Sequence, residues 1–422
     1  MQNDIAKTVS EIIADVRENG DAAVKKYTEK FDKVALVSFE VPAEEIESAY
    51  KTADRSALRV MKFAAKNIRK FAEAQIKQFR DFDIETIKGC RAGQKIVPLE
   101  RAGLYVPGGR FPLPSSALMA IIPAKVAGVD EVIVCSPPSS NGSINPLILV
   151  ASKIGGADRV FKIGGVQAIA AMAYGTKTVP RVDKIAGPGN AYVAEAKKQV
   201  YGDVGIDIVA GPSEVMIIAD ETANPAFIAS DLLAQAEHDV NASATLITIS
   251  ESLAEKVKKK LEAQLNVLKT ANIARESMNK NGKTIIVKTI EEAIEVANKT
   301  APEHLELQIE NPKKYLDELR NYGSLFLGNY SAEVLADYVA GINHVLPTRN
   351  TARYCSGLSV KDFVKMQTWL QVDNKSYKDI GKMAAKFAGI EGLDAHKASA
   401  EARIFADTKP KKQKSTPINS SP

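Results

Sequence analysis

Cysteine is scarce in this chain of 422 residues. The three cysteines, Cys90, Cys135 and Cys355, lie far apart and form no CxxC pair. An odd, widely spaced set argues against a disulfide framework. No apolar run reaches the ~18 residues that a membrane helix needs. The charged, amphipathic N-terminal segment is unlike a signal peptide. We therefore expect a cytoplasmic protein with no membrane partner.

Net charge is also low outside one short segment. The formal charge is +5, and four lysines near the C-terminus, Lys409, Lys411, Lys412 and Lys414, supply +4 of it. The rest of the chain therefore lacks the basic balance of a nucleic-acid-binding protein, and no nucleic-acid partner is expected. The Pro/Ser/Lys-rich composition of 409–422 predicts a disordered tail.

Strand-like and helix-like segments alternate through the middle of the chain. The first ninety residues have helical periodicity, and helix returns from about Val360 to residue 406. Between them, the apolar runs that we expect to be strands are 102–106, 131–135, 159–163, 183–187, 207–211, 215–219, 245–249, 284–287, 305–309 and 324–328. Such alternation predicts an α/β protein with parallel sheets covered by helices, and the number of strands predicts two lobes.

Glycine-rich turns follow several of these strand candidates, although none matches GxGxxG. They are VPGG, KIGG, AGPGNA and AGPSE, which contain Gly108, Gly164, Gly187 and Gly211. Ligands of α/β proteins bind at the carboxyl ends of strands. A tight βα turn explains any single one of these segments. The complete set, with its nearby polar side chains, favours a ligand site.

The chain has only four histidines, and their contexts are polar. In DLLAQAEHD, Gln235 and His238 are three residues apart and share one face of a predicted helix. A histidine with an oxygen ligand one turn away is typical of a metal site. A carboxylate would be a stronger zinc ligand than the Gln235 amide, and an ordinary helix end is the alternative interpretation.

The other histidines lie near carboxylates. Glu303 and His304 follow Pro302 in TAPEHLEL, and two adjacent groups of different pKa suit two proton-transfer tasks. Both would reach one site only if the chain is irregular there, and a surface turn is the alternative. The remaining groups, which could each be solvated, are Asp337 with His344 and Glu391 with His396.

Taken together, these segments resemble the histidinol dehydrogenase family. The strings that carry the resemblance are PLERAGLYVPGG, IGGVQAIAAMAYGT, VDKIAGPGNAYVAEAK, VAGPSEVMIIAD, LLAQAEHD, TAPEHLEL, SLFLGNYSAEVLADYVAGINHVLPT and AHK, in family order from about residue 6 to 406. One departure is Ile342, where the family commonly has Thr.

The resemblance implies a division of the chain. Two incomplete Rossmann-like lobes would be formed by 1–104 with 213–358, which would carry the metal and catalytic residues, and by 105–212, which would carry the NAD contacts. A helical dimerisation arm, 359–408, would cross to the partner subunit of a homodimer.

The resemblance also implies residue roles. Zinc would be bound by Gln235, His238, Asp337 and His396, with His396 coming from the partner. The substrate pocket would contain Ser213, Gln235, His238, His304, Asp337, Glu391 and His396. NAD would contact Tyr105, Gln167 and Asn190, and Glu303 and His304 would be the acid–base pair.

The implied reaction is the four-electron oxidation of L-histidinol to L-histidine, with two NAD and a zinc ion that orients the substrate. One alternative keeps the scaffold, zinc and NAD but acts on another primary alcohol, such as a sulfonated diol. Glu391 favours histidinol, because it could pair with the ammonium group. A non-catalytic protein on the same scaffold is a third hypothesis, and it would predict the loss of a base or a metal ligand.

Overall fold

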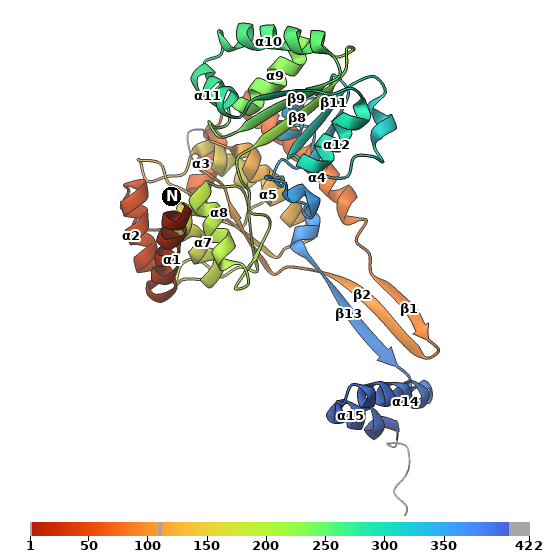
Figure 1. Cartoon of the computed structure of the whole chain (residues 1–422). Coiled ribbons are helices and arrows are strands. Elements are labelled where there is room, and N and C mark those ends of the chain that lie inside the picture. The colour runs from red at the N-terminus through yellow and green to blue at the C-terminus, as the bar shows by residue number, and fades with distance from the viewer. Residues whose placement is uncertain (1, 109–111, 405–422) are drawn as a thin grey trace, which may run out of the picture. The chain divides into compact units, whose positions relative to one another are not determined.

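The computed structural model describes residues 2–108 and 112–404 (Figure 1). The chain divides into two units, of which one contains residues up to 78 and 98–364, and the other contains 79–97 and the residues from 365 onward. The predicted tail, 409–422, lies outside the described residues. Within the described residues, no helix is long and apolar enough to cross a membrane.

The first sheet of the large unit is parallel, with the strand order β5-β4-β3-β6-β7. Its strands are β3 (Arg101–Tyr105), β4 (Glu131–Ser136), β5 (Arg159–Lys162), β6 (Lys184–Ala186) and β7 (Gly205–Ile206). The chain moves outward from β3 to β5 and then returns to the other side of β3. The direction of strand addition therefore reverses between β3 and β6, which is where ligands bind in open α/β sheets.

Helices cover both faces of this sheet. One layer contains α3 (Ala43–Thr52), α4 (Arg55–Ile76), α5 (Pro114–Ala127) and α6 (Pro146–Gly155). The other contains α1 (Gln2–Asn19), α2 (Asp21–Asp32), α7 (Gly165–Tyr174) and α8 (Ala191–Val200). α5 is apolar on all sides because it packs between the sheet and α4.

The N-terminal helices differ from the expected domain division. The expected division places 1–104 with 213–358, whereas Val9, Ile12 and Val24 share a core with β3, β4 and α7 of the first sheet. Sequence periodicity identifies the apolar face of a helix but not the surface against which that face packs.

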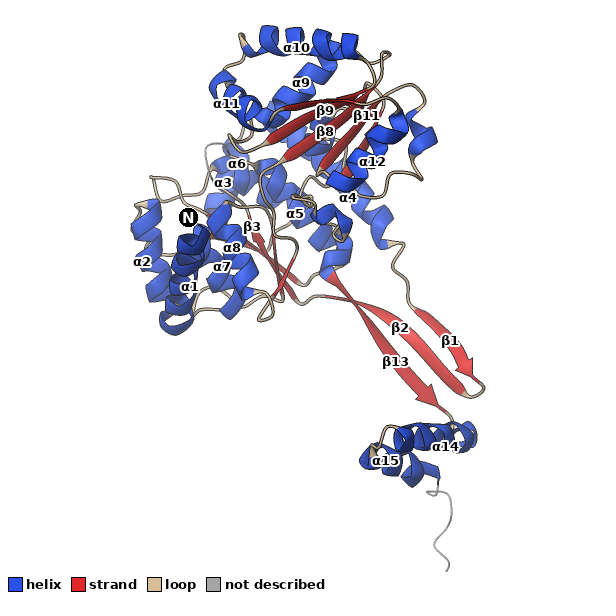
Figure 2. Ribbon diagram, viewed as in Figure 1, coloured by secondary structure: helices blue, strands red, loops and turns tan. Residues whose placement is uncertain are grey.

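The second sheet repeats the topology of the first, with the parallel order β10-β9-β8-β11-β12 (Figure 2). Its strands are β8 (Glu214–Ala219), β9 (Ser243–Thr248), β10 (Lys283–Ile286), β11 (His304–Gln308) and β12 (Ser324–Leu327). One face is covered by α9 (Pro225–Ala236), α10 (Glu251–Leu265) and α11 (Ala271–Asn281), and the other by α12 (Ile290–Thr300). The short helix α13 (Glu333–Tyr338) follows β12 and packs against α9.

The two parallel sheets confirm the predicted α/β class, but one expected strand is wrong. Residues 207–211 are irregular, and the two-residue strand β7 lies just before them. The AGPSE segment therefore precedes β8 instead of following a strand. Its apolar residues suggested an extended run, yet Gly211 instead donates its N–H to Thr348 Oγ1 at 2.6 Å.

The small unit contains a three-stranded sheet and two helices. The strands β1 (Phe82–Ile87) and β2 (Cys90–Pro98) form an antiparallel hairpin, β13 (Val364–Val372) lies beside β2, and α14 (Asn374–Ile390) and α15 (Asp394–Ile404) follow. The helices confirm the predicted helical C-terminal segment. The expectation of helix up to residue 90 and beyond Val360 is wrong for β1 and β13, and β2 lies where no element was expected. β1 does carry a strand signal, because apolar and polar residues alternate from Phe82 to Glu85, and the helical expectation overlooked it. All six of its residues are exposed.

Candidate functional site

The residues of the expected site lie in three places. Tyr105, Gln167 and Asn190 lie at the carboxyl edge of the first sheet, where β3 ends and where α7 and α8 begin. The second group lies at the amino edge of the second sheet, at the end of α9 and the turn after it, and on α13; it contains Ser213, Gln235, His238, Glu303, His304 and Asp337. The third, Glu391 and His396, lies in the small unit.

Tyr105 connects two turns of the first group. It is buried at the end of β3, and its hydroxyl oxygen accepts a hydrogen bond from the Gly165 N–H at 3.1 Å. Burial raises the pKa of the Tyr105 hydroxyl to about 12, so this group is protonated at neutral pH. The hydroxyl therefore retains a hydrogen to donate to a ligand.

Gln167, in the first turn of α7, is the most informative member of this group. The side chain is 1% exposed, and both its amide oxygen and its amide nitrogen lack a hydrogen-bond partner among the described residues. A buried amide without partners is costly, so such a group indicates a missing ligand or water.

Asn190 begins α8 and is exposed. Its side-chain oxygen accepts hydrogen bonds from the N–H groups of Tyr192 and Val193 at 3.0 and 3.1 Å, as an N-cap residue does. Its amide nitrogen remains free to donate outward. Together with the positive end of α8, this favours a phosphate or another electron-rich group at this edge.

The second group is organised around the main chain of Glu214, the first residue of β8. The Glu214 N–H donates to Glu303 Oε2 at 2.8 Å, and the Glu214 carbonyl lies 3.1 Å from His304 Nδ1. Both Glu303 and His304 are buried, at 5% and 4% exposure. Ser213 lies directly before Glu214, at the same edge of the sheet.

This arrangement fixes the tautomer of His304. Because a carbonyl can only accept, Nδ1 carries the hydrogen and Nε2 carries the lone pair. His304 Nε2 is buried, has no hydrogen-bond partner among the described residues, and lies 3.9 Å from Asp337 Oδ1. Burial lowers the pKa of His304 to about 4, against the opposing effect of Asp337. The ring is therefore a neutral base whose free nitrogen faces the candidate site.

Glu303 has the opposite shift. Burial raises the pKa of its carboxyl well above the usual range, and the negative charges of Glu214 and Asp337 act in the same direction, whereas the Glu214 N–H opposes them. The two adjacent groups thus have pKa values moved in opposite directions by one environment, which is a common property of acid–base pairs.

Gln235 in the last turn of α9 and His238, two residues past its end, complete the potential metal-binding set with Asp337. The predicted helix therefore ends before His238. Gln235 is fully buried, and both its amide oxygen and its amide nitrogen lack partners among the described residues. His238 Nδ1 lies 3.0 Å from the Ala234 carbonyl, which leaves Nε2 free, and His238 is close enough to His304 to lower its pKa. An amide oxygen, an imidazole nitrogen and a carboxylate are suitable zinc donors. They would form an incomplete set, and no group of three or more His, Cys, Asp or Glu suited to a metal occurs in the described part of this single chain.

His344 and Ser116 lie beside this set and were not in the expected site. His344 Nδ1 is 2.9 Å from the Asp337 carbonyl, and Ser116 Oγ is 3.2 Å from His344 Nε2. Burial lowers the pKa of His344, so it too is neutral. The sequence context of His344 suggested a loop near Asp337, whereas nothing in the sequence pointed to Ser116, which comes from α5.

A row of buried acidic and amide groups lies behind His304 and was also missed. His304, Glu306 and Gln308 alternate along β11 and point to one face. Glu306 Oε1 accepts the Glu333 N–H at 2.9 Å, and Gln308 Nε2 donates to Glu306 Oε2 at 2.8 Å and to Asp231 Oδ2 at 2.9 Å. Glu333 Oε2 lies 3.7 Å from His304 Nδ1.

Burial is the main cause of raised pKa values in this row. It raises the pKa of Asp231 to about 6 and that of Glu306 to about 8, where the negative charge of Asp231 adds to the shift. It also raises the pKa of Glu333 well above the usual range. Glu306 therefore keeps its proton at neutral pH. The row connects α9, β11 and α13.

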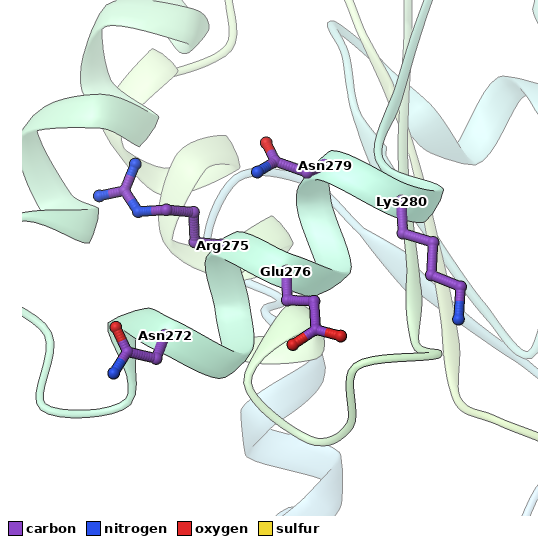
Figure 3. Close-up of a pocket in the computed structure, with 5 residues that line it drawn as sticks. All are labelled: Asn272, Arg275, Glu276, Asn279 and Lys280. Carbon is purple, nitrogen blue, oxygen red and sulfur yellow. The ribbon is translucent and has the colours of Figure 1, made fainter.

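The structure does not bring Glu391 and His396 to the other site residues within one unit. Glu391 follows α14, His396 is on α15, and both are exposed. Their expected role remains a prediction. A shallow surface hollow on α11, formed by Asn272, Arg275, Glu276, Asn279 and Lys280, contains none of the candidate residues (Figure 3).

The family model, the similar sequences and a similar solved structure all point to the same protein family. The family model for histidinol dehydrogenase matches residues 1–404. A histidinol dehydrogenase of Clostridium acetobutylicum is 48% identical over 95% of this chain and 93% of its own length. One of Methanosarcina mazei is also 48% identical, over 95% and 92%. The crystal structure of histidinol dehydrogenase from Elizabethkingia anophelis superposes with a TM-score of 0.91 at 40% identity, covering 96% of this chain and 93% of that one.

Proposed function

The chain belongs to the histidinol dehydrogenase family, and from this premise we propose that it oxidises L-histidinol to L-histidine through the aldehyde, with two NAD as hydride acceptors. The observation that carries the proposal is the attachment of Glu303 and His304 to the main chain of Glu214. It provides a neutral base and a second proton-transfer group at one buried place.

In the first oxidation, His304 Nε2 would take the proton of the alcohol as hydride leaves the adjacent carbon. Its lone pair is free, because Nδ1 is bound to the Glu214 carbonyl. Burial keeps the ring neutral before the reaction, so the base is present in its active form at neutral pH. Asp337 Oδ1, 3.9 Å away, would stabilise the imidazolium that forms.

In the second oxidation, water must add to the aldehyde before the second hydride leaves. Glu303 would take a proton from that water, and its raised pKa makes the ionised form a stronger base than an ordinary carboxylate. The Glu214 N–H holds Glu303 Oε2, which leaves the other oxygen for the water.

A zinc ion would be held by Gln235, His238 and Asp337, with His396 of a second subunit as the fourth ligand. The unpartnered buried amide of Gln235 fits this role. When bound, zinc supplies a fixed positive centre that orients the imidazole and amino nitrogens of the substrate. Ser213 and Glu391 would complete the substrate pocket, and Glu391 would pair with the ammonium group.

NAD would bind at the carboxyl edge of the first sheet. Tyr105 ends β3 and Asn190 follows β6, and the strand order reverses between these two strands. Gln167, whose amide has no partner among the described residues, lies on α7 after the edge strand β5, two residues from Gly165, which donates its N–H to Tyr105. A bound dinucleotide would accept hydride from the substrate carbon.

A homodimer would complete the site. The small unit exposes many large apolar side chains, among them Phe82, Ile84, Met366, Leu370, Met383, Phe387 and Ile390. Exposed apolar side chains on this scale are typical of a surface covered by a protein partner. A second copy of the chain would bury them and bring His396 to the metal.

The test is the stoichiometry of NADH formation. Zinc-loaded protein is incubated with L-histidinol and excess NAD until absorbance stops changing. Two NADH per histidinol, lost on chelation, would support the full proposal. One NADH would remove the role proposed for Glu303. No NADH would count against histidinol and favour another primary alcohol, such as a sulfonated diol.

A further inference from the structure

A buried ion pair lies in the first lobe, next to the turn that ends at Asn190. Lys197 on α8 pairs with Asp207, which follows β7. Their side chains are 3% and 1% exposed. Charged side chains are almost never so fully buried unless they are paired, and a buried pair adds little net stability over an apolar pair of similar volume. The pair therefore calls for a geometric explanation.

Both members of the pair bind one residue, Gly187. Asp207 Oδ2 accepts the Gly187 N–H at 2.8 Å, and Lys197 Nζ donates to the Gly187 carbonyl at 2.9 Å. The peptide groups on both sides of Gly187 are thus held by charged partners. Hydrogen bonds to charged groups are stronger than those between neutral groups.

Gly187 is the first residue of the turn that leads from β6 to α8. Its φ is 117°, and a Cβ at this position would collide with the Tyr105 carbonyl oxygen. Only glycine fits, so the turn packs directly on the end of β3. This is the place where the strand order reverses, and the same turn ends at Asn190.

We infer that Lys197 and Asp207 are positioning residues for the cofactor, which hold the turn 187–190 in its binding geometry by fixing both peptide groups of Gly187. The inference rests on the proposed binding of NAD at this edge. Neither side chain is exposed enough to touch the dinucleotide. They act through Gly187, whose turn carries Asn190 and contacts Tyr105.

Removing this ion pair should weaken the binding of the dinucleotide while leaving the KM for the alcohol unchanged. The variant Lys197→Met/Asp207→Asn removes both charges together, so that no unpaired buried charge remains. The amide introduced by Asp207→Asn can still accept the Gly187 N–H, but the thioether introduced by Lys197→Met cannot donate to the Gly187 carbonyl. The dissociation constant for NADH should rise ~10–100-fold, which corresponds to the loss of one hydrogen bond to a charged group.

The matched control is Glu40→Gln in the same lobe. Glu40 forms a two-hydrogen-bond ion pair with Arg159 at 2.8 and 2.7 Å, at the opposite edge from the turn. This variant also loses an ion pair and should bind NADH as the wild type does. Thermal unfolding of each variant, without ligands, measures the general loss of stability.

The experiment is a fluorescence titration of NADH into the full-length, zinc-loaded protein, with KM measured for NAD and for histidinol. A raised NADH dissociation constant and NAD KM, with the histidinol KM within about twofold of the wild type, is the expected result. Unchanged NADH affinity in a folded double variant, or an equal rise in Glu40→Gln, would overturn the inference.

A second, conservative variant tests the inference even if the double variant does not fold. Lys197→Arg keeps the charge but moves the donors, and it should raise the NADH dissociation constant by a smaller factor. An unchanged constant in folded Lys197→Arg would also overturn the inference. If the wild-type protein itself does not bind NADH, the proposed cofactor site fails, and this inference fails with it.

Discussion

Glu303 and His304 are adjacent in the sequence, and both bind the main chain of Glu214, through its N–H and its carbonyl respectively. Neighbours in a regular strand would point to opposite faces of the sheet. Glu303 lies just before β11 begins and follows Pro302, so its side chain is free to turn toward β8. The ring orientation and the carboxylate position are therefore set by backbone groups, which side-chain substitutions elsewhere do not remove.

Substitution of His304 and substitution of Glu303 should slow different half-reactions, the oxidation of the alcohol and that of the aldehyde respectively. His304→Asn removes the base and should lower kcat for histidinol by ~10²–10⁴-fold. Glu303→Gln should lower the oxidation of the supplied aldehyde by a similar factor, while single-turnover oxidation of the alcohol to the aldehyde changes by less than about tenfold. Rapid-mixing measurements of NADH formation from alcohol and from aldehyde separate the two steps.

Unchanged zinc content in both variants is the control, because it shows that the metal site is intact. Equal losses in both half-reactions for Glu303→Gln would contradict the separate roles.

Much of the fold could be predicted from the sequence, because buried parallel strands have continuous apolar runs. The strands with such runs, β3, β4 and β8 among them, were located correctly. The strands of the small unit were not. β1 and β13 both begin with a short apolar/polar alternation, at residues 82–85 and 364–367, but β1 is exposed at every position and β13 at most of them, and neither has the continuous apolar run of a buried strand.

Only part of the candidate site could be predicted from the sequence, because some of its residues come together only in the folded chain. Glu303 and His304 were found because acid and base are adjacent in the chain. Glu306 lies two residues later and appears in the sequence as an ordinary polar position of a strand. Its burial depends on Asp231 and Glu333, which come from helices distant in the sequence. Periodicity cannot predict which helices meet over a strand.

The amide of Gln235 provides a test of metal binding. Gln235→Leu keeps the volume of the side chain but removes its oxygen. If Gln235 is a ligand, the zinc content of purified protein should fall at a limiting zinc concentration, with an affinity ~10–100-fold lower than that of the wild type. The metal-free variant should unfold no more easily than the metal-free wild type, because a buried amide without partners has been removed.

Gln167→Leu is the matched control for that prediction. Gln167 is also a buried amide without partners, but it lies in the first lobe. This variant should retain zinc and lose affinity for NADH. Full zinc occupancy and full activity in Gln235→Leu would remove Gln235 from the ligand set.

The buried acidic row predicts a pH dependence of stability. Burial raises the pKa of Glu306 from 4.5 to about 8. Between these pH values the folded protein holds a proton that the unfolded chain has released, so the free energy of unfolding falls as the pH rises through this window. Glu306→Gln removes the titrating group and should lose less stability than the wild type between about pH 5 and pH 8, by on the order of 1–2 kcal/mol.

Denaturant unfolding at the two pH values measures this difference. Glu310→Gln is the control, since Glu310 follows the same strand but is exposed. A Glu306→Gln variant whose stability changes with pH as much as that of the wild type would show that Glu306 titrates normally in the folded protein.

The proposed sharing of His396 between subunits predicts complementation. His304→Asn and His396→Asn should each be inactive as homodimers. After subunit exchange in an equal mixture, half of the dimers should be hybrids. In each hybrid, one site combines both substitutions, and the other site combines two intact subunit contributions. Activity should therefore return to about a quarter of the wild-type value. Exchange is verified by native mass spectrometry of subunits with different tags. Hybrids that form without any recovered activity would mean that His304 and His396 of one site come from the same subunit, and the metal would then need a fourth ligand from within that subunit.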